Sequence, residues 1–124
     1  EIINILKRIK IPWSVNSLAQ DAANAVIKNT SHIKKSNMII QKELKYLEDN
    51  ISILDKFQCI PSFTNFILIK TKYDSTKLQK KLLKNKILIR DCKNFRGLDN
   101  QYIRIAVKSH KDNVKLVKAL EKIK

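Results

Sequence analysis

Apolar residues recur at every third or fourth position through the first half of the chain. The first stripe consists of Val15, Leu18, Ala19, Ala22, Ala23, Val26 and Ile27. This spacing predicts an amphipathic helix over about 14–28, capped by Ser14 and separated by Pro12 from a weakly helical stretch at 2–9. The second stripe consists of Ile33, Ile40, Leu44, Leu47, Ile51 and Leu54. It predicts a long helix over about 31–55.

From residue 59 the pattern changes to alternation. Residues 65–71 (NFILIKT), 87–91 (ILIRD) and 102–108 (YIRIAVK) are predicted strands, and 59–62 is a turn or a short edge strand. Asp74 or Ser75 is expected to cap a helix through Lys84, and Ser109, with Asp112 in a capping box, begins the last helix. The predicted fold class is α+β: a small, mainly antiparallel sheet of three to four strands covered on one face by helices. The two N-terminal helices are expected to add to that layer.

Side chains of a strand point alternately to the two faces of its sheet. Ile103, Ile105 and Val107 share one face of their strand and should meet the helices, so Arg104 should project from the open face. Arg90 closes the preceding strand. The two guanidinium groups either converge on one anion or each lie separately in water, and spacing alone leaves both alternatives open.

The composition of the chain shows that arginine is rare among its basic residues. The chain has 124 residues, which favours one domain, with a helical part at 1–56 and a β-α-β-β-α part at 57–124. Its net charge is +15, and only four of its 26 basic residues are arginine: Arg8, Arg90, Arg96 and Arg104. An arginine in a chain that otherwise uses lysine indicates a need for the two-pronged guanidinium group, which binds phosphate or carboxylate through paired hydrogen bonds. The lysines are spread over all the helices, which favours solvated faces over a nucleic-acid patch.

Several classes of function are disfavoured by what the sequence lacks. A single glycine, Gly97, excludes glycine-rich phosphate loops. No apolar run approaches the roughly 20 residues of a membrane span, and no signal-peptide pattern occurs, so a reducing cytoplasmic location is expected. The two cysteines and two histidines form no metal-binding or nucleophilic motif. The residues alone therefore predict an anion-binding α+β module without a catalytic centre of its own, and the start at Glu1 suggests a piece of a longer polypeptide.

Four segments carry a resemblance to a known family. They are residues 12–20 (PWSVNSLAQ), 61–68 (PSFTNFIL), 87–98 (ILIRDCKNFRGL) and 102–107 (YIRIAV). In this order, from about residue 10 to the end, they resemble the C-terminal small domain of fold-type I pyridoxal-phosphate enzymes. More narrowly, the chain is similar to the group that contains histidinol-phosphate aminotransferases and threonine-phosphate decarboxylases. PWSVN and RDCKNFRGL favour the decarboxylase branch.

The resemblance implies a two-domain enzyme of which residues 1–124 are the small domain. The large domain would hold pyridoxal 5'-phosphate, its Schiff-base lysine and the aspartate that pairs with the pyridine nitrogen, so this chain alone should be inactive. By position, Arg104 matches the arginine that clamps an anionic group of the substrate, and Arg90 matches the one associated with the substrate phosphate. Arg96 would assist from the loop, and Asn16 either lines the cleft or caps a helix. The full-length enzyme would be a homodimer.

The activity implied by the resemblance is a pyridoxal-phosphate-dependent L-threonine-O-3-phosphate decarboxylase, a lyase that yields aminopropanol phosphate for cobalamin biosynthesis. One alternative is a histidinol-phosphate aminotransferase of histidine biosynthesis. Others are a basic nucleic-acid-binding α+β module and a separate regulatory module that binds small molecules. The scarcity of aromatic residues, with no stacking pattern in YIRIAVK, argues against RNA recognition.

Overall fold

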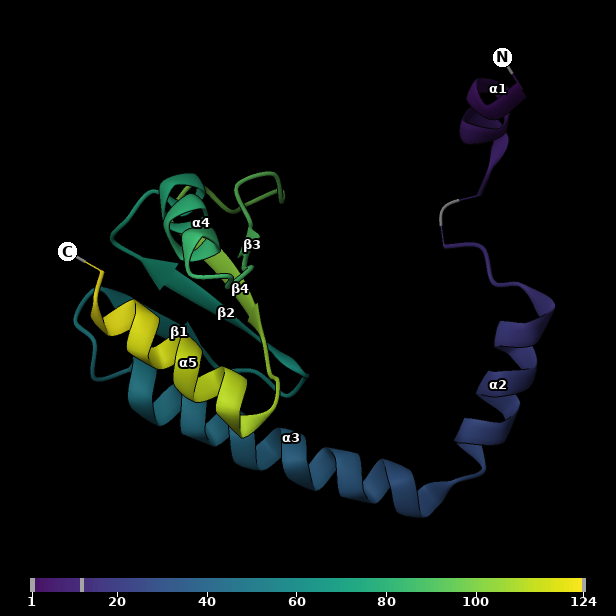
Figure 1. Cartoon of the computed structure of the whole chain (residues 1–124), viewed down its shortest axis with the longest axis horizontal. Helices are drawn as coiled ribbons and strands as arrows, with labels where there is room; N and C mark the ends of the chain where they lie inside the picture. The colour runs from purple at the N-terminus through teal and green to yellow at the C-terminus, as the bar shows by residue number, and fades with distance from the viewer. Residues whose placement is uncertain (1, 12, 124) are drawn as a thin grey trace. The chain divides into compact units, whose positions relative to one another are not determined.

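The computed structural model describes residues 2–11 and 13–123, and it divides into two compact units, Glu1–Lys35 and Ser36–Lys124. In chain order (Figure 1) the elements are α1 (Ile2–Ile9), α2 (Ser17–Ile27), α3 (Thr30–Ile51), β1 (Phe57–Ile60), β2 (Phe66–Thr71), α4 (Ser75–Lys84), β3 (Arg90–Asp91), β4 (Tyr102–Ala106) and α5 (His110–Glu121). The change from helical to mixed structure falls between the end of α3 and the start of β1. None of the described helices has the length and apolar character that a membrane span requires.

The first unit is helical and buries none of its described residues. Helix α2 begins later than predicted, because Asn16 rather than Ser14 is its N-cap: the Asn16 side chain accepts a hydrogen bond from the Ala19 amide at 2.9 Å. All described side chains of α2 are exposed. The predicted break at Pro12 lies outside the described residues.

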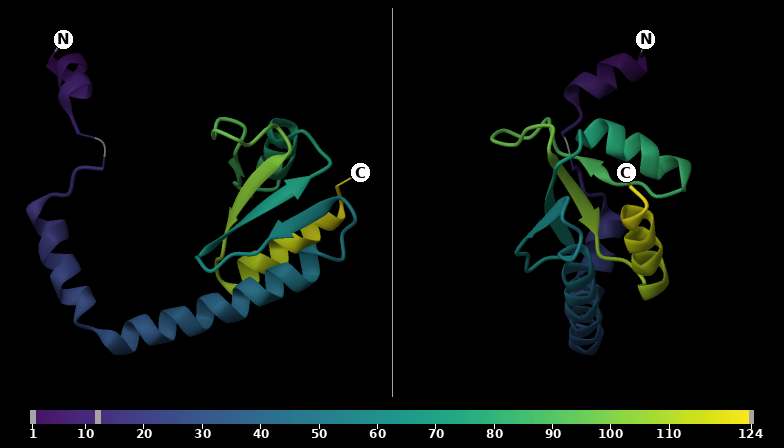
Figure 2. Two further views of the ribbon diagram at one scale, coloured as in Figure 1. Left: turned by 180° about the vertical axis from the view of Figure 1, so that it is seen from behind. Right: turned by 90° about the vertical axis from the view of Figure 1, so that its left-hand side faces the viewer.

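The second unit is built on a four-stranded antiparallel sheet with the order β1-β2-β4-β3. The predicted α+β class is confirmed, and the segment at 59–62 contributes to a true edge strand, β1. The buried face of the sheet carries four isoleucines: Ile67 and Ile69 from β2, and Ile103 and Ile105 from β4. Figure 2 shows these strands from two further directions.

Helices α3, α4 and α5 supply the other half of the core. Their buried apolar side chains are Leu44, Leu47 and Ile51 from α3, Leu78 and Leu82 from α4, and Leu116, Val117 and Leu120 from α5. Alternation in β4 is as predicted, since Ile103 and Ile105 are buried and Val107 packs against the same cluster. The opposite face of the sheet carries no helix from this unit, and Arg104 projects there, half-buried.

Two predicted elements are shorter in the structure. Strand β3 has only two residues: residues 87–89 lie outside the strand, and the carbonyl of Ile89 accepts a hydrogen bond from the Gln79 side chain at 2.7 Å. Helix α3 ends at Ile51 instead of continuing to 55, because the Leu54 amide turns back to the Ile51 carbonyl. The caps of α4 by Asp74 and of α5 by Ser109 are as predicted.

A buried polar cluster joins α3 to α5, which lie side by side in Figure 1. The Glu43 carboxylate accepts hydrogen bonds from Asn113 at 2.9 Å and from His110 at 3.1 Å. Burial acts to raise the pKa of Glu43, but these hydrogen bonds and the positive charge nearby outweigh it and hold the pKa below its usual value. The buried carboxylate is thus ionised and paired, as a charge in a protein interior must be.

Candidate functional site

The open face of the sheet brings two arginines together. Arg90 of β3 is the direct antiparallel partner of Arg104 in β4, and Arg104 in turn pairs with Leu68 of β2. Side chains directly opposite each other on neighbouring strands start only about 4.5–5.5 Å apart at Cβ. The two guanidinium groups therefore arise side by side from one face of the sheet. Sequence spacing alone had left open whether they converge or lie apart.

No carboxylate neutralises this pair among the described residues. The ion pairs in that part of the chain are Lys93 with Asp91 and His110 with Glu43. The hydrogen bond made by Arg90 is to the Asn94 side-chain oxygen, at 3.3 Å. Like charges directly opposite on adjacent strands destabilise a sheet, so their juxtaposition is expected where an anion is bound.

Aromatic rings lie beneath both guanidinium groups. The Arg104 guanidinium carbon is 4.7 Å from the centre of the Phe66 ring, and that of Arg90 is 5.4 Å from the centre of the Phe95 ring. Phe66 lies in the segment 61–68 that carries the family resemblance, but the sequence predicted a contact with an arginine for neither aromatic residue. Alternation in β2 could have placed Phe66 on the open face, whereas no periodic signal marks Phe95, which lies in the loop after β3.

A groove of about 550 Å³ contains both arginines. It is lined by Asn65, Phe66, Gln79, Leu88, Ile89, Arg90, Arg104 and Ala106. Two positive charges within a lining that is half polar and half apolar suit a small organic molecule with anionic substituents.

Strand β3 is anchored on its other face by Asp91. The Asp91 carboxylate accepts hydrogen bonds from the hydroxyls of Ser75 and Thr76, both at 2.7 Å, and from the Lys93 amide at 3.1 Å. Burial acts to raise the pKa of Asp91, but these hydrogen bonds together outweigh it and lower the pKa. The carboxylate next to Arg90 in sequence thus points toward the start of α4 and leaves the guanidinium charge uncompensated.

Stability should reflect the ionisation of Asp91. Because its folded-state pKa is lowered, the carboxylate stabilises the fold above its usual value of 3.8, and this contribution is lost as the pH falls through the lowered value. We expect Asp91→Asn to unfold at a lower urea concentration than the wild type near pH 7. The difference between the two urea midpoints should narrow as the pH falls below 3.8. A gap that persisted unchanged in acid would contradict this account.

The other candidate residues are distributed differently. Arg96 is exposed in the loop that joins β3 to β4, and Asn16 serves as the cap of α2 in the first unit. Cys92 is buried close to the arginines, and burial raises the pKa of its thiol although both guanidinium charges oppose this. Burial likewise raises the pKa of Cys59, to about 11. Neither thiol has the lowered pKa of a reactive cysteine.

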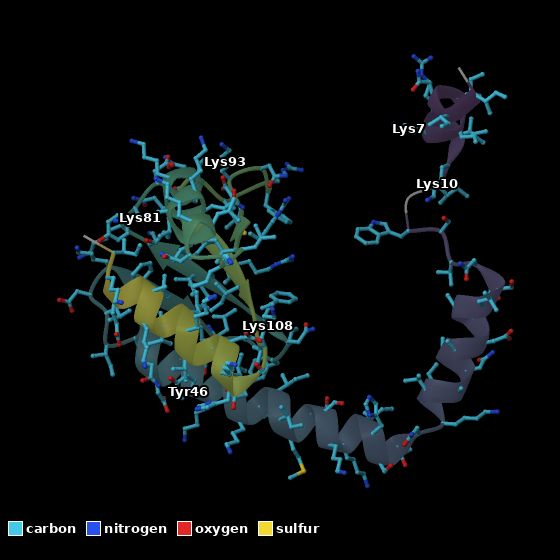
Figure 3. The ribbon with its side chains drawn as sticks, viewed as in Figure 1. Lys7, Lys10, Tyr46, Lys81, Lys93 and Lys108 are labelled. Carbon is cyan, nitrogen blue, oxygen red and sulfur yellow. The ribbon has the colours of Figure 1, made fainter. Side chains whose placement is uncertain are left out.

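The excess lysines do not gather at this groove. Figure 3 labels Lys81 on α4, Lys93 in the loop after β3 and Lys108 after β4, and none of these three lines the groove. Within residues 2–11 and 13–123, no group of three acidic, histidine or cysteine side chains could hold a metal ion. The arginine pair is therefore the feature of the second unit that most favours ligand binding.

The family follows from comparison with known proteins. The model of class I and II aminotransferases matches residues 1–123. The chain belongs to the class I and II aminotransferase family. Members of this family are pyridoxal-phosphate-dependent enzymes. The match to the family model therefore starts before residue 12, where the first of the four segments that carry the resemblance begins.

Two relatives and one solved structure illustrate what this aminotransferase-family chain is similar to. It is 38% identical over 122 residues to a histidinol-phosphate aminotransferase of Clostridium kluyveri, covering 98% of this chain and 34% of that protein. It is 30% identical over 118 residues to the threonine-phosphate decarboxylase of Salmonella typhimurium, and the match covers 95% of this chain and 32% of that protein. The crystal structure of the Clostridium acetobutylicum histidinol-phosphate aminotransferase matches 97% of this chain and 36% of its own, with 34% identity and a TM-score of 0.79.

This aminotransferase-family chain spans about a third of the length of the curated relatives it matches. The groove contains no lysine that could carry pyridoxal phosphate and no carboxylate that could pair with a pyridine nitrogen. The groove residues thus do not fit the cofactor. They fit anionic groups of a substrate.

Proposed function

We propose that this chain is the part of a pyridoxal-phosphate-dependent L-threonine-O-3-phosphate decarboxylase that binds the anionic groups of the substrate. The observation that carries the proposal is the register pair Arg90 and Arg104, which lies in a groove and is not neutralised by a carboxylate among the described residues. A phosphoamino acid has a phosphate and a carboxylate separated by only a few bonds, and two adjacent guanidinium groups suit such a molecule. In this proposal Arg90 binds the phosphate of the substrate. Arg104, on β4, clamps an anionic group of the substrate.

The two arginines would contribute by orienting the substrate. When bound, pyridoxal phosphate supplies an electron sink for the bond that breaks. Which bond breaks then depends on the substrate torsion, because only the bond aligned with the π system of the cofactor is weakened. Arg90 and Arg104, fixed on neighbouring strands, would hold the charged groups so that the bond to the carboxylate is the aligned one. Decarboxylation releases carbon dioxide and leaves aminopropanol phosphate, a precursor suited to cobalamin biosynthesis.

A histidinol-phosphate aminotransferase is the second candidate. The 38% identity to the Clostridium kluyveri enzyme favours it, and the decarboxylase identity is of similar size. Such an enzyme would use the same arginines for the phosphate of one substrate and the carboxylates of the other. The motifs PWSVN and RDCKNFRGL favour the decarboxylase.

The proposal includes partners beyond the described residues. The exposed apolar side chains of α1 and α2 suit a surface that packs against the cofactor-binding large domain of the same enzyme. We propose that the full-length protein is a cytoplasmic homodimer, and that this chain alone catalyses no turnover because the cofactor lysine lies in the large domain. Arg96 and Asn16 are proposed as auxiliary substrate contacts.

The test uses the full-length enzyme that carries this chain, loaded with pyridoxal phosphate. It is offered O-phospho-L-threonine while carbon dioxide release is measured, and separately histidinol phosphate with 2-oxoglutarate while glutamate is measured. Carbon dioxide release supports the decarboxylase. Glutamate formation would replace it with the aminotransferase, and turnover of neither substrate would contradict both.

A further inference from the structure

The two paired guanidinium groups need something other than a carboxylate to hold them in place. A long arginine side chain on an exposed face has many rotamers, and ordering it costs conformational entropy. Arg90 and Arg104 also repel each other, because they start from directly opposed positions on β3 and β4. A carboxylate would hold them, but it would occupy the same N–H donors that an anionic ligand requires.

Phe66 provides such a restraint for Arg104 without using its donors. Phe66 pairs with Ala106, two residues along β4 from Arg104, so the ring reaches Arg104 diagonally across the strand pair. The guanidinium carbon lies 4.7 Å from the ring centre, within the range of a cation–π contact. A guanidinium group held through its face keeps the N–H groups at its edge available.

Phe95 contacts the face of the Arg90 guanidinium, which also donates one hydrogen bond to the Asn94 side chain at 3.3 Å, and the loop is built to place the Phe95 ring. The Phe95 amide donates to the Cys92 carbonyl, and the Leu98 amide donates to the Phe95 carbonyl, each at 3.0 Å. Gly97, third in the second of these turns, has φ of 84°, a conformation that favours glycine. The only glycine of the chain therefore closes the turn that begins at Phe95.

We propose that Phe66 and Phe95 are positioning residues, which hold the guanidinium faces of Arg104 and Arg90 so that their N–H edges are presented to an anion. The inference rests on the proposed function for the identity of that anion. The two supports are independent of each other, since Phe66 belongs to a central strand and Phe95 to a loop at the sheet edge. Substitution of one ring should therefore disturb its own arginine and leave the other in place.

The test uses the arginine side-chain Nε–H signals of the 124-residue chain in a ¹H–¹⁵N NMR spectrum. Only four arginines are present, so the signals can be assigned with single Arg→Lys variants, and Arg8 and Arg96 serve as internal references. Spectra are compared for the wild type, Phe66→Leu and Phe95→Leu, and then for Phe66→Tyr and Phe95→Tyr. Inorganic phosphate is titrated into each sample.

We expect Phe66→Leu to shift the Arg104 signal through loss of the ring current, and to raise the phosphate dissociation constant roughly 2- to 5-fold. Phe95→Leu should do the same at Arg90, and the tyrosine variants should restore wild-type shifts and affinity. Phe63→Leu is the matched control, because Phe63 is 91% exposed and no cation–π contact includes it among the described residues.

Leucine variants with wild-type arginine shifts and phosphate affinity would overturn the proposal. Tyrosine variants as weak as the leucine variants would overturn it too, since bulk rather than the aromatic face would then matter. Should Phe66→Leu fail to fold, Phe95→Leu in the exposed loop decides the matter alone. Phosphate that moved no arginine signal of the wild type would count against the proposed function, while the shifts without phosphate would still decide whether the rings hold the guanidinium groups.

Discussion

Replacing Arg104 with lysine in the full-length enzyme is expected to lower kcat/KM for O-phospho-L-threonine about 10- to 100-fold. Lysine retains the positive charge but loses the planar pair of donors, and a hydrogen bond to a charged group is worth about 1.5–3 kcal/mol. The compact ammonium would also be held less well by the Phe66 ring than the flat guanidinium. Steady-state kinetics with carbon dioxide detection measures the effect.

The matched control is Arg8→Lys, which makes the same chemical change on exposed helix α1. It should leave both kinetic constants near the wild-type values. Near-normal turnover of the Arg104→Lys enzyme would remove Arg104 from the substrate site. An equal loss in both variants would mean that the assay reports stability and not substrate binding.

Asn113→Ala should lower the free energy of unfolding by about 2–4 kcal/mol. The Asn113 side chain is almost fully buried, donates to the Glu43 carboxylate and the Lys108 carbonyl, and accepts from the Lys108 amide. Its removal leaves a buried charge with fewer hydrogen bonds, which costs far more than an ordinary surface contact. Urea denaturation followed by circular dichroism gives the value.

Asn37→Ala is the control for that measurement, because Asn37 lies exposed on α3. Alanine is the better helix former, so this variant should be as stable as the wild type or slightly more stable. Equal midpoints for the two variants would show that the cluster around Glu43 contributes nothing to stability.

The outward direction of Arg104 was predictable because burial fixes the strand that carries it. Alternation of Ile103 and Ile105 with polar neighbours leaves one arrangement in which the isoleucines enter the core, and the structure has that arrangement. The residue that lies directly opposite Arg90 could not be predicted in the same way. It depends on the register of β3 with β4, which is a relation between two segments and not a property of either one.

Predictions near element ends were wrong where a side chain competed with a regular backbone pattern. Asn16 displaced Ser14 as the cap of α2, because its side chain accepts a hydrogen bond from the Ala19 amide. Polar side chains close to backbone groups offer such alternatives, and periodicity contains no information about them. The ring beneath Arg90 was likewise hidden, because two consecutive turns bring Phe95 to it.

The packed core constrains Arg104 and the loop between β3 and β4 in different ways. Slippage of β4 by a single residue would drive Arg104 into the core, so the burial of Ile103 and Ile105 fixes the face from which Arg104 projects. No such penalty applies to the exposed loop residues 94–97, which contribute no side chain to the packed face. The direction of the Arg104 side chain is therefore set by the core, whereas the support beneath Arg90 depends on a loop that the core does not hold.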